Sequence, residues 1–286
     1  MAIQTAGIPE LDEAQRIIIA KSRYTQEHVA PMLGLVDHFT LGKGEKQLTI
    51  PKVGQMTASD LTDGIDIAAS EDIGMTADQI DCEEVGLKVI ITDKLARQLN
   101  EDVFSMVGRQ VGDAMARKKD KDLLALFNGL SGAADGADAI SIAYYGAVSS
   151  LLRAVPAPLP LIAVVHPYQA YVLKAAIATA GTYMLTGSIV EDVIKTWQVG
   201  TWAGVPCYED GNIETTGDTL AHGAMFSKTG CLGYLQSLAD TTERERDASL
   251  RATELVIVCD YEAFAIDTLY GYDMYYTCTS PTYYTT

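Results

Sequence analysis

The sequence predicts an α+β fold, in which helices and sheets occupy different parts of the domain. Three features predict it. A long apolar stripe over residues 92–127 is typical of a helix, a fully apolar run at 161–165 is typical of a buried strand, and the sequence beyond Thr242 is strand-like over a long stretch. With 286 residues the chain is long enough for about two domains and a sizeable core.

The N-terminal part of the chain is predicted to be an arm. A helix is expected from Leu11 to Ala30, because isoleucines cluster within it and Pro31 should end it. Several glycines then loosen the chain before a short strand at Gln47–Val53, in which apolar and polar residues alternate.

Residues 54–84 form an acidic stretch without a single Lys or Arg. It lies between the strand at Gln47–Val53 and a second strand at Val85–Ile91, so the simplest geometry is an antiparallel pair that carries an extended loop. A loop this long within a domain is usually functional, and we expect it to have a partner. Its acidic residues are Asp60, Asp63, Asp66, Glu71, Asp72, Asp78, Asp81, Glu83 and Glu84.

The strongest helix signal begins at Thr92, a favourable N-cap, with Asp93 in the first turn where the helix dipole favours a carboxylate. Apolar residues recur every four positions to Met115 and continue to Phe127, before Asn128-Gly129 ends the helix. A four-residue repeat drifts around a helix of 3.6 residues per turn, so the stripe should spiral and contact several partners. The late turns hold the densest basic cluster of the chain: Arg117, Lys118, Lys119 and Lys121.

The following part of the chain is predicted to alternate helices and strands. Ser141 opens an amphipathic helix that Pro156 closes, and the strand at 161–165 leads into a helix from Pro167 to Ala180. Further strands are expected at Gly204–Tyr208, Ala224–Phe226, Leu232–Leu235, Leu255–Cys259, Tyr261–Asp267 and Gly271–Tyr276.

Composition restricts the class of protein. A net charge of −17 argues against gripping nucleic acid, because such binding requires Lys and Arg to displace counterions from phosphates. The five cysteines contain no CxxC pair and are odd in number, which is typical of reduced thiols in a protein that folds in the cytoplasm. No secretory signal is recognised, and no stretch has the roughly 20 apolar residues needed to cross a bilayer.

No catalytic, cofactor-binding or metal-binding residue is predicted. The four histidines do not have metal-ligand spacing, and no hydrolase, P-loop or dinucleotide motif occurs. The carboxylates of Asp60, Asp63 and Asp66 are of the kind that bind calcium, but their spacing is not that of an EF-hand, and a solvated loop is favoured. His166, before Pro167, is interpreted as a polar residue at a strand-to-helix turn and not as a catalytic base.

Four short segments stand out when they are taken in order along the chain: Lys119–Gly129, Pro160–Ala170, Gly204–Tyr208 and Glu243–Arg251. They resemble, in that order, the end of the spine helix, the strand-to-helix step of the axial domain, a glycine-valine-proline-any-tyrosine strand and the returning peripheral strand of tailed-phage major capsid proteins with the Hong Kong 97 type fold. No single motif is specific. The shared order carries the resemblance, which spans nearly the whole chain.

The resemblance implies a Hong Kong 97 type capsid fold with an N-terminal arm, an extended β-hairpin loop, a long spine helix in a peripheral domain and a mixed α/β axial domain. The expected bounds are 1–46 for the arm, 47–91 for the extended loop, 92–139 for the peripheral domain with the spine helix, 140–236 for the axial domain and 237–286 for the return strands of the peripheral domain.

The resemblance also implies a function. The chain is expected to be a non-enzymatic major capsid protein that forms pentamers and hexamers and closes into an icosahedral shell. The shell would enclose double-stranded DNA without specific binding, since an acidic inner surface lets DNA slide. It would be assembled in the host cytoplasm and become the virion capsid. Expected partners are a separate scaffolding protein, because no long charged helical segment precedes the arm, a portal and a decoration protein. A covalent cross-link through a loop lysine is not expected, because the loop has no Lys between Lys52 and Lys88.

A hypothesis about contacts between subunits follows. Carboxylates of the extended loop would lie on basic residues of a neighbouring subunit and fix its register, not supply most of the affinity. The residues assigned to this contact are Asp60, Asp63, Asp66, Glu71 and Asp72 on the loop, and Arg117, Lys118, Lys119, Arg244 and Arg246 on the neighbour. The alternative is that both sets are merely solvated.

Three other functions are compatible with the sequence. An encapsulin-like nanocompartment shell would share the fold and enclose a cargo enzyme. A phage tail component would form rings or tubes. A soluble α/β enzyme that uses the strand end at His166 would have a deep polar pocket.

Overall fold

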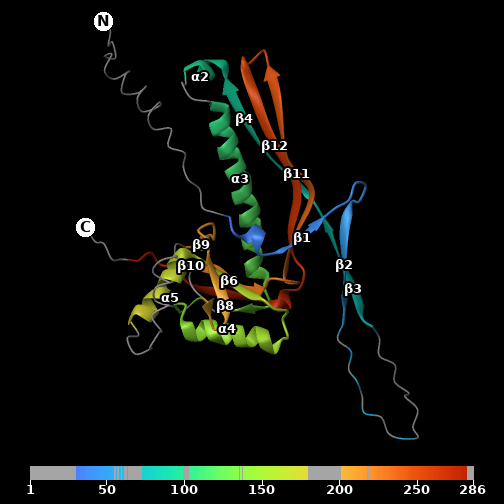
Figure 1. The fold of residues 1–286 in the computed structure, drawn as a ribbon, viewed down its shortest axis with the longest axis vertical. Helices are drawn as coiled ribbons and strands as arrows, with labels where there is room; N and C mark the ends of the chain where they lie inside the picture. The colour runs from blue at the N-terminus through green and yellow to red at the C-terminus, as the bar shows by residue number, and fades with distance from the viewer. Residues whose placement is uncertain are drawn as a thin grey trace.

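The computed structural model describes the residues from Ala30 to Pro281 with several gaps, and it places them in two sheets and a projecting two-stranded ribbon (Figure 1). The predicted helix at 11–30 therefore lies almost wholly outside the described residues. The described residues are 30–54, 56, 58, 60, 63, 73–98, 103–134, 136, 138–179, 201–217 and 219–281.

The first sheet has four strands in the order β1-β11-β12-β4. Strand β1 is parallel to β11, and the other neighbours are antiparallel. The predicted strand at 232–235 and the strand-like residues 243–247 belong to one continuous strand, β11, whereas the predicted strand at 255–259 lies in β12. The strands are β1 (Asp37–Thr40), β11 (Leu232–Asp247), β12 (Ala252–Ala265) and β4 (Glu83–Thr92).

The helix expected from Thr92 to Phe127 is described as two helices. Helix α2 (Asp93–Gln98) lies across the end of α3 (Val103–Ala125), and α3 runs along the long strands of the four-stranded sheet (Figure 1). Residues 99–102, between the two helices, lie outside the described residues. One continuous helix was predicted because the same apolar repeat runs through both segments. That prediction was wrong, since α2 and α3 lie in different directions (Figure 1). Short 3₁₀ turns precede and follow this region, η1 (Met32–Gly34) and η2 (Leu126–Gly129).

The second sheet has seven strands, with the path β5-β13-β10-β6-β8-β7 and with β9 paired to β10. Helices α4 (Ile142–Ala154) and α5 (Pro167–Thr179) belong to this part of the molecule (Figure 1). The Ser141 side chain caps α4 by accepting a hydrogen bond from the Tyr144 amide at 3.2 Å, which confirms the predicted start. The strands are β5 (Gly132–Ala133), β6 (Leu161–Val165), β7 (Thr201–Trp202), β8 (Val205–Glu209), β9 (Thr215–Thr216), β10 (Leu220–Ser227) and β13 (Gly271–Thr277), and a 3₁₀ turn η3 (Thr268–Tyr270) precedes β13.

The core is built on both faces of the seven-stranded sheet, and β6 shows why. Ile162 and Val164 point into a cluster that α3 and the four-stranded sheet share. Leu161, Ala163 and Val165 point into a second cluster with α4 and α5. Because both faces are covered, every residue of β6 is buried, as its continuous apolar run predicts.

Strands β2 (Gln47–Val53) and β3 (Met75–Asp81) form the projecting ribbon. The strand at Gln47–Val53 has the predicted bounds. The prediction that it pairs with the strand at 85–91 was wrong, because that segment belongs to β4 and pairs with β12. The hairpin partner is β3, within the acidic stretch. Its sequence, MTADQID, has no apolar alternation, so the sequence pattern did not mark it as a strand.

The return of the chain also differs from the expected division. Strand β13 pairs with β10 in the seven-stranded sheet and not with the return strands β11 and β12. Strand β5 joins the same sheet through β13. Both segments were expected in the peripheral domain, and their strand pairing places them in the other sheet.

Candidate assembly site

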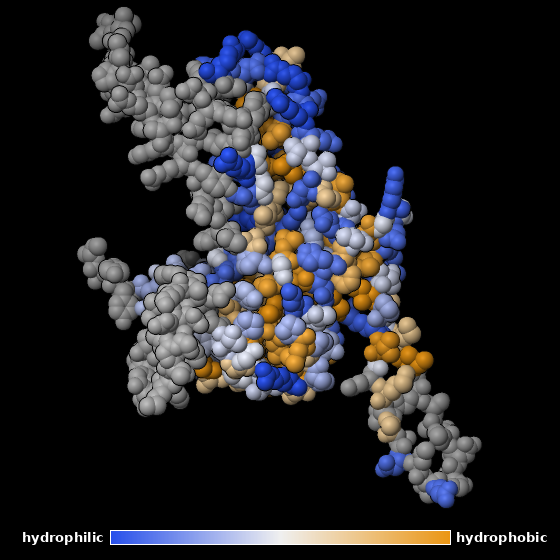
Figure 2. Space-filling model, viewed as in Figure 1, coloured by the Kyte–Doolittle hydropathy of each residue, from blue (hydrophilic) through white to orange (hydrophobic). Residues whose placement is uncertain are grey.

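The β2–β3 ribbon exposes apolar side chains on a part of the chain that projects from the body (Figure 1). Figure 2 shows apolar side chains gathered where the described ribbon ends. Val53, Met56, Ile73 and Met75 are each more than half exposed, and we call these four residues the apolar tip. An isolated two-stranded hairpin is marginally stable in water, so a ribbon of this kind gains stability when another element or another chain packs against it.

The acidic loop residues can be followed only in part. Asp60 and Asp63 are exposed beyond the apolar tip, whereas Asp66, Glu71 and Asp72 lie outside the described residues. Within the paired strands, Lys52 of β2 pairs with Asp78 of β3 at 2.7 Å, with both side chains well exposed. The ribbon therefore carries an acidic end, and its described Lys is already paired within the hairpin.

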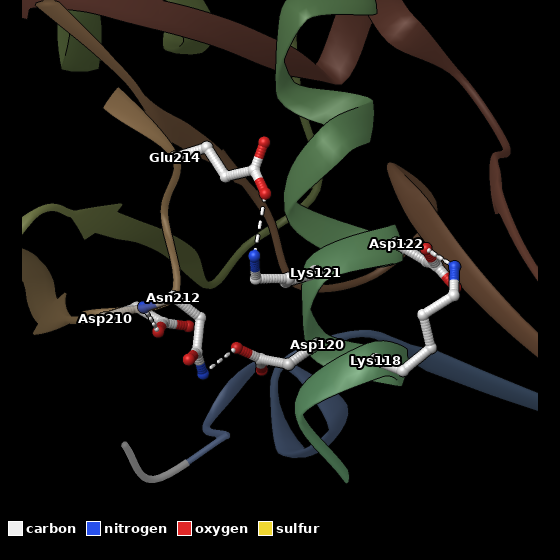
Figure 3. Close-up of polar contacts among 7 residues, drawn as sticks. All are labelled: Lys118, Asp120, Lys121, Asp122, Asp210, Asn212 and Glu214. Carbon is white, nitrogen blue, oxygen red and sulfur yellow. Dashed lines mark hydrogen bonds and ion pairs between the residues drawn. The ribbon is translucent and has the colours of Figure 1, made fainter. Parts of the chain in front are cut away.

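The basic cluster on α3 is divided by the turn of the helix. Lys118 points to Asp122 at 2.5 Å and Lys121 to Glu214 at 2.7 Å, on different sides of the helix (Figure 3). Lys119 is buried and pairs with Asp240 at 2.6 Å.

The burial of Lys119 has a structural cause. Its ammonium lies 5.7 Å from the centre of the Tyr261 ring. Asp240 falls between Leu238 and Thr241, where the pairing of β11 with β12 shifts register, so a β-bulge directs it toward the helix. Lys119 therefore joins helix to sheet, and its prediction as a contact for a neighbouring loop does not fit its position.

The two arginines of β11 lie at the exposed end of the four-stranded sheet. The Arg246 guanidinium donates two hydrogen bonds to Asp93 at the start of α2, at 2.5 and 2.8 Å. This bidentate pair holds the pKa of Asp93 below its ordinary value. Arg244 is exposed two residues earlier, opposite Leu255 in the strand pairing.

A cleft of about 790 Å³ lies between α3 and the loop after β8. Lys118 and Lys121 line it from the helix, and Glu214 lines it from the loop. Arg117 and His166 complete its charged or titratable lining. Two of the predicted contact residues, Arg117 and Lys118, thus line the same cleft.

His166, at the end of β6, contacts a cysteine thiol. Its Nδ1 lies 3.0 Å from Cys278 Sγ and also accepts a hydrogen bond from the Tyr168 amide at 3.2 Å. Burial raises the pKa of the Cys278 thiol to about 11, so the thiol stays protonated near neutral pH. The contact joins the end of β6 to the segment after β13.

Three buried polar residues, to which the sequence analysis assigned no contact, connect α3 to the loop after β8. Asp120 accepts a hydrogen bond from the Asn212 side-chain amide at 2.9 Å, and Asp210 accepts one from the Asn212 backbone amide at 2.8 Å (Figure 3). Asp120 also accepts a bond from the Met32 amide at 3.0 Å. No local pattern marks this network, because its members are far apart in the sequence.

Within the described part of the chain, no three His, Cys, Asp or Glu side chains converge as a metal site would require. None of the helices in those residues is long and apolar enough to cross a bilayer.

Comparisons with known proteins point in one direction. A family model described as phage capsid protein matches residues 83–274, which is more than half of the chain. A search of curated protein sequences found no match.

The fold is similar to the head structure of Helicobacter pylori bacteriophage KHP40, with a TM-score of 0.74 and 11% identity over 89% of this chain and 92% of that one. The capsid of cyanophage P-SCSP1u gives 0.68 and 14% over 90% of each chain. A chain of Mycobacterium phage Che8 gives 0.66 and 14% over 88% of this chain and 92% of that one. At these identities the likeness is one of fold, and it is a mixed α/β fold of phage capsids.

Proposed function

We propose that this chain, which belongs to the phage capsid protein family, builds the closed icosahedral head shell of a tailed phage and encloses double-stranded DNA. Family membership gives it the role of a capsid shell protein. The observation that carries the finer proposal is the β2–β3 ribbon, whose apolar tip is exposed on a projection without a core of its own. A ribbon of this kind is stabilised when a neighbouring copy covers it.

The elements can be assigned to the parts of a Hong Kong 97 type subunit. In this proposal α3 is the spine helix, the four-stranded sheet with α3 is the peripheral domain, and the β2–β3 ribbon is the extended loop. The seven-stranded sheet with α4 and α5 is the axial domain, and it takes in β5 and β13 beyond the expected bounds. The chain before Gln47 would be the arm.

The subunit contact is proposed to have an apolar and an electrostatic part. The apolar tip supplies apolar surface that is buried against a neighbouring subunit. Loop carboxylates such as Asp60 and Asp63 pair with Arg117, Lys118, Arg244 or Arg246 of that neighbour. Exposed ion pairs contribute about 0–1 kcal/mol each, so these pairs fix register while burial of the tip supplies most of the affinity. Repetition around a closed shell adds up many weak contacts.

The remaining partners belong to the same proposal. Pentamers and hexamers would form with a separate scaffolding protein and a portal, in the host cytoplasm, and a decoration protein could bind the finished virion capsid. The net charge of −17 keeps free subunits apart and prevents tight binding of the enclosed DNA. The role proposed is structural and not enzymatic.

Charge reversal tests the electrostatic part. The double variant Asp60→Lys with Asp63→Lys should assemble poorly at low salt and remain a folded subunit, because both residues are exposed. Adding Arg244→Glu or Lys118→Glu should restore assembly where that residue is the true partner. Sedimentation measures assembly, and circular dichroism measures folding. Normal particles from the loop variant alone would refute the pairing.

Electron microscopy of the concentrated protein, expressed with its scaffold, tests the shell itself. Closed particles with icosahedral symmetry are expected, and particles purified from infected cells should protect double-stranded DNA from nuclease. Tubes, open rings or a persistent monomer would contradict the proposal, and an enclosed protein cargo without DNA would point to a nanocompartment.

A further inference from the structure

The Asp120–Asn212–Asp210 network joins three elements that are distant in sequence (Figure 3). Asp120 lies in α3, Asp210 follows β8, and the amide bonded to Asp120 Oδ1 belongs to Met32 in η1. Asp120 is fully buried, and Asp210 is 1% exposed. The segment before the ribbon, the long helix and the seven-stranded sheet thus meet at two buried carboxyl groups.

The hydrogen bonds leave one carboxyl oxygen without a donor. Both oxygens of Asp120 accept bonds, Oδ1 from the Met32 amide and Oδ2 from the Asn212 side chain. Asp210 Oδ1 accepts the Asn212 amide, whereas Asp210 Oδ2 is buried with no partner among the described residues. Both carboxyl groups are joined through Asn212, so two carboxylates there would repel each other, whereas a proton on Asp210 Oδ2 would remove one charge and turn that unpaired oxygen into a donor.

The charged groups around the pair do not replace that proton. From α3, Lys121 is engaged by Glu214. From α5, Lys174 is engaged by Glu209, next to Asp210. Arg117 and His166 line the adjacent cleft.

We propose that Asp210 keeps its proton at neutral pH and forms a latch with Asn212 and Asp120, which holds α3 and η1 against the loop after β8 and releases them in alkaline solution. The latch is a property of the single chain. In an assembled shell, opening it would change how α3 sits on the seven-stranded sheet, and only this consequence rests on the proposed function.

The direction of the pH dependence follows from the pKa. Burial, followed by the hydrogen bond to Asp120, raises the pKa of Asp210 from 3.8 to about 8. The folded chain therefore keeps a proton that the unfolded chain loses. The stability contributed by the latch is complete below about pH 4, falls as the pH rises, and is lost above about pH 8.

Hydrogen exchange of the full chain, followed by mass spectrometry, tests the latch. Protection of the Met32 and Asn212 amides, corrected for the intrinsic exchange rate, should fall by about tenfold or more between about pH 6 and about pH 9. The Asp210→Asn variant keeps a neutral group that can donate to Asp120, and its protection should stay within about twofold over the same range. Glu84→Gln removes an exposed carboxylate from β4 and should behave as the wild type does.

Two results would overturn the latch: constant protection in the wild type, or a loss in Asp210→Asn as large as that in the wild type. If Asp210→Asn does not fold, the wild-type profile decides alone. Protection must then fall at Met32 and Asn212 while the amide of Val148, buried in α4, keeps its protection.

Discussion

The β2–β3 ribbon and the centre of the seven-stranded sheet are both built from β-strands, yet they differ in what covers them. Strand β6 is buried on both faces, between α3 on one side and α4 with α5 on the other. Strands β2 and β3 pair with each other, and Ile80 is the only residue of β3 that is even partly buried. The seven-stranded sheet is covered within one chain, whereas the exposed ribbon is proposed to be covered by a neighbouring copy.

The same contrast separates two kinds of mutation. In the buried sheet, a lost methylene group leaves a cavity and lowers the stability of the chain. On the ribbon, the same loss should leave the isolated chain unchanged and should weaken only the proposed contact with another copy. Stability and assembly should therefore respond to different residues of one molecule.

A matched pair of methionine substitutions tests this most strongly. Met225 in β10 is fully buried and Met75 in β3 is 64% exposed. Met225→Ala should lower the free energy of unfolding by about 2–5 kcal/mol, and Met75→Ala by less than about 0.5 kcal/mol. Urea unfolding of the unassembled chain measures both. Met75→Ala should instead raise the concentration needed for particle formation, and equal unfolding energies would break the comparison.

The buried ion pair of Lys119 should come next in size. Lys119→Met preserves the length of the side chain and leaves Asp240, which is half exposed and can hydrate. We expect a loss of about 1–2 kcal/mol, below that for a fully buried pair. Thermal unfolding with and without salt measures it. A larger loss would mean that Asp240 stays desolvated.

The cap of α4 gives an intermediate effect. Ser141→Ala removes the acceptor for the Tyr144 amide and should cost about 1 kcal/mol, whereas Ser141→Asp should keep most of the stability. Chemical denaturation of the two variants side by side provides the measurement. Equal losses in both would show that the cap does not stabilise α4.

The smallest effect is expected for the ion pair on the ribbon. Lys52→Met removes the partner of Asp78, but both side chains are exposed, so the change should be within about 0.5 kcal/mol. Together with Lys119→Met it compares the same substitution at an exposed and at a buried site. A loss as large as that at Lys119 would indicate that the ribbon is ordered within the single chain.

The sequence by itself determined the elements whose signal is local. The bounds of β2, the buried strand β6, the cap at Ser141 and the start of α5 at Pro167 all follow from patterns within about ten residues. The order of such patterns was enough to place the chain among phage capsid proteins, and the family match agrees with it.

Only the tertiary structure decided which elements meet. Strand β4 pairs with β12 and β13 joins the seven-stranded sheet, because strand pairing depends on which edges are free and not on neighbours in sequence. The partner of Lys119 lies 121 residues away, and Asn212 lies 92 residues from Asp120. Local propensity cannot encode such contacts. They form when burial of the apolar faces brings polar groups together and leaves each of them in need of a partner.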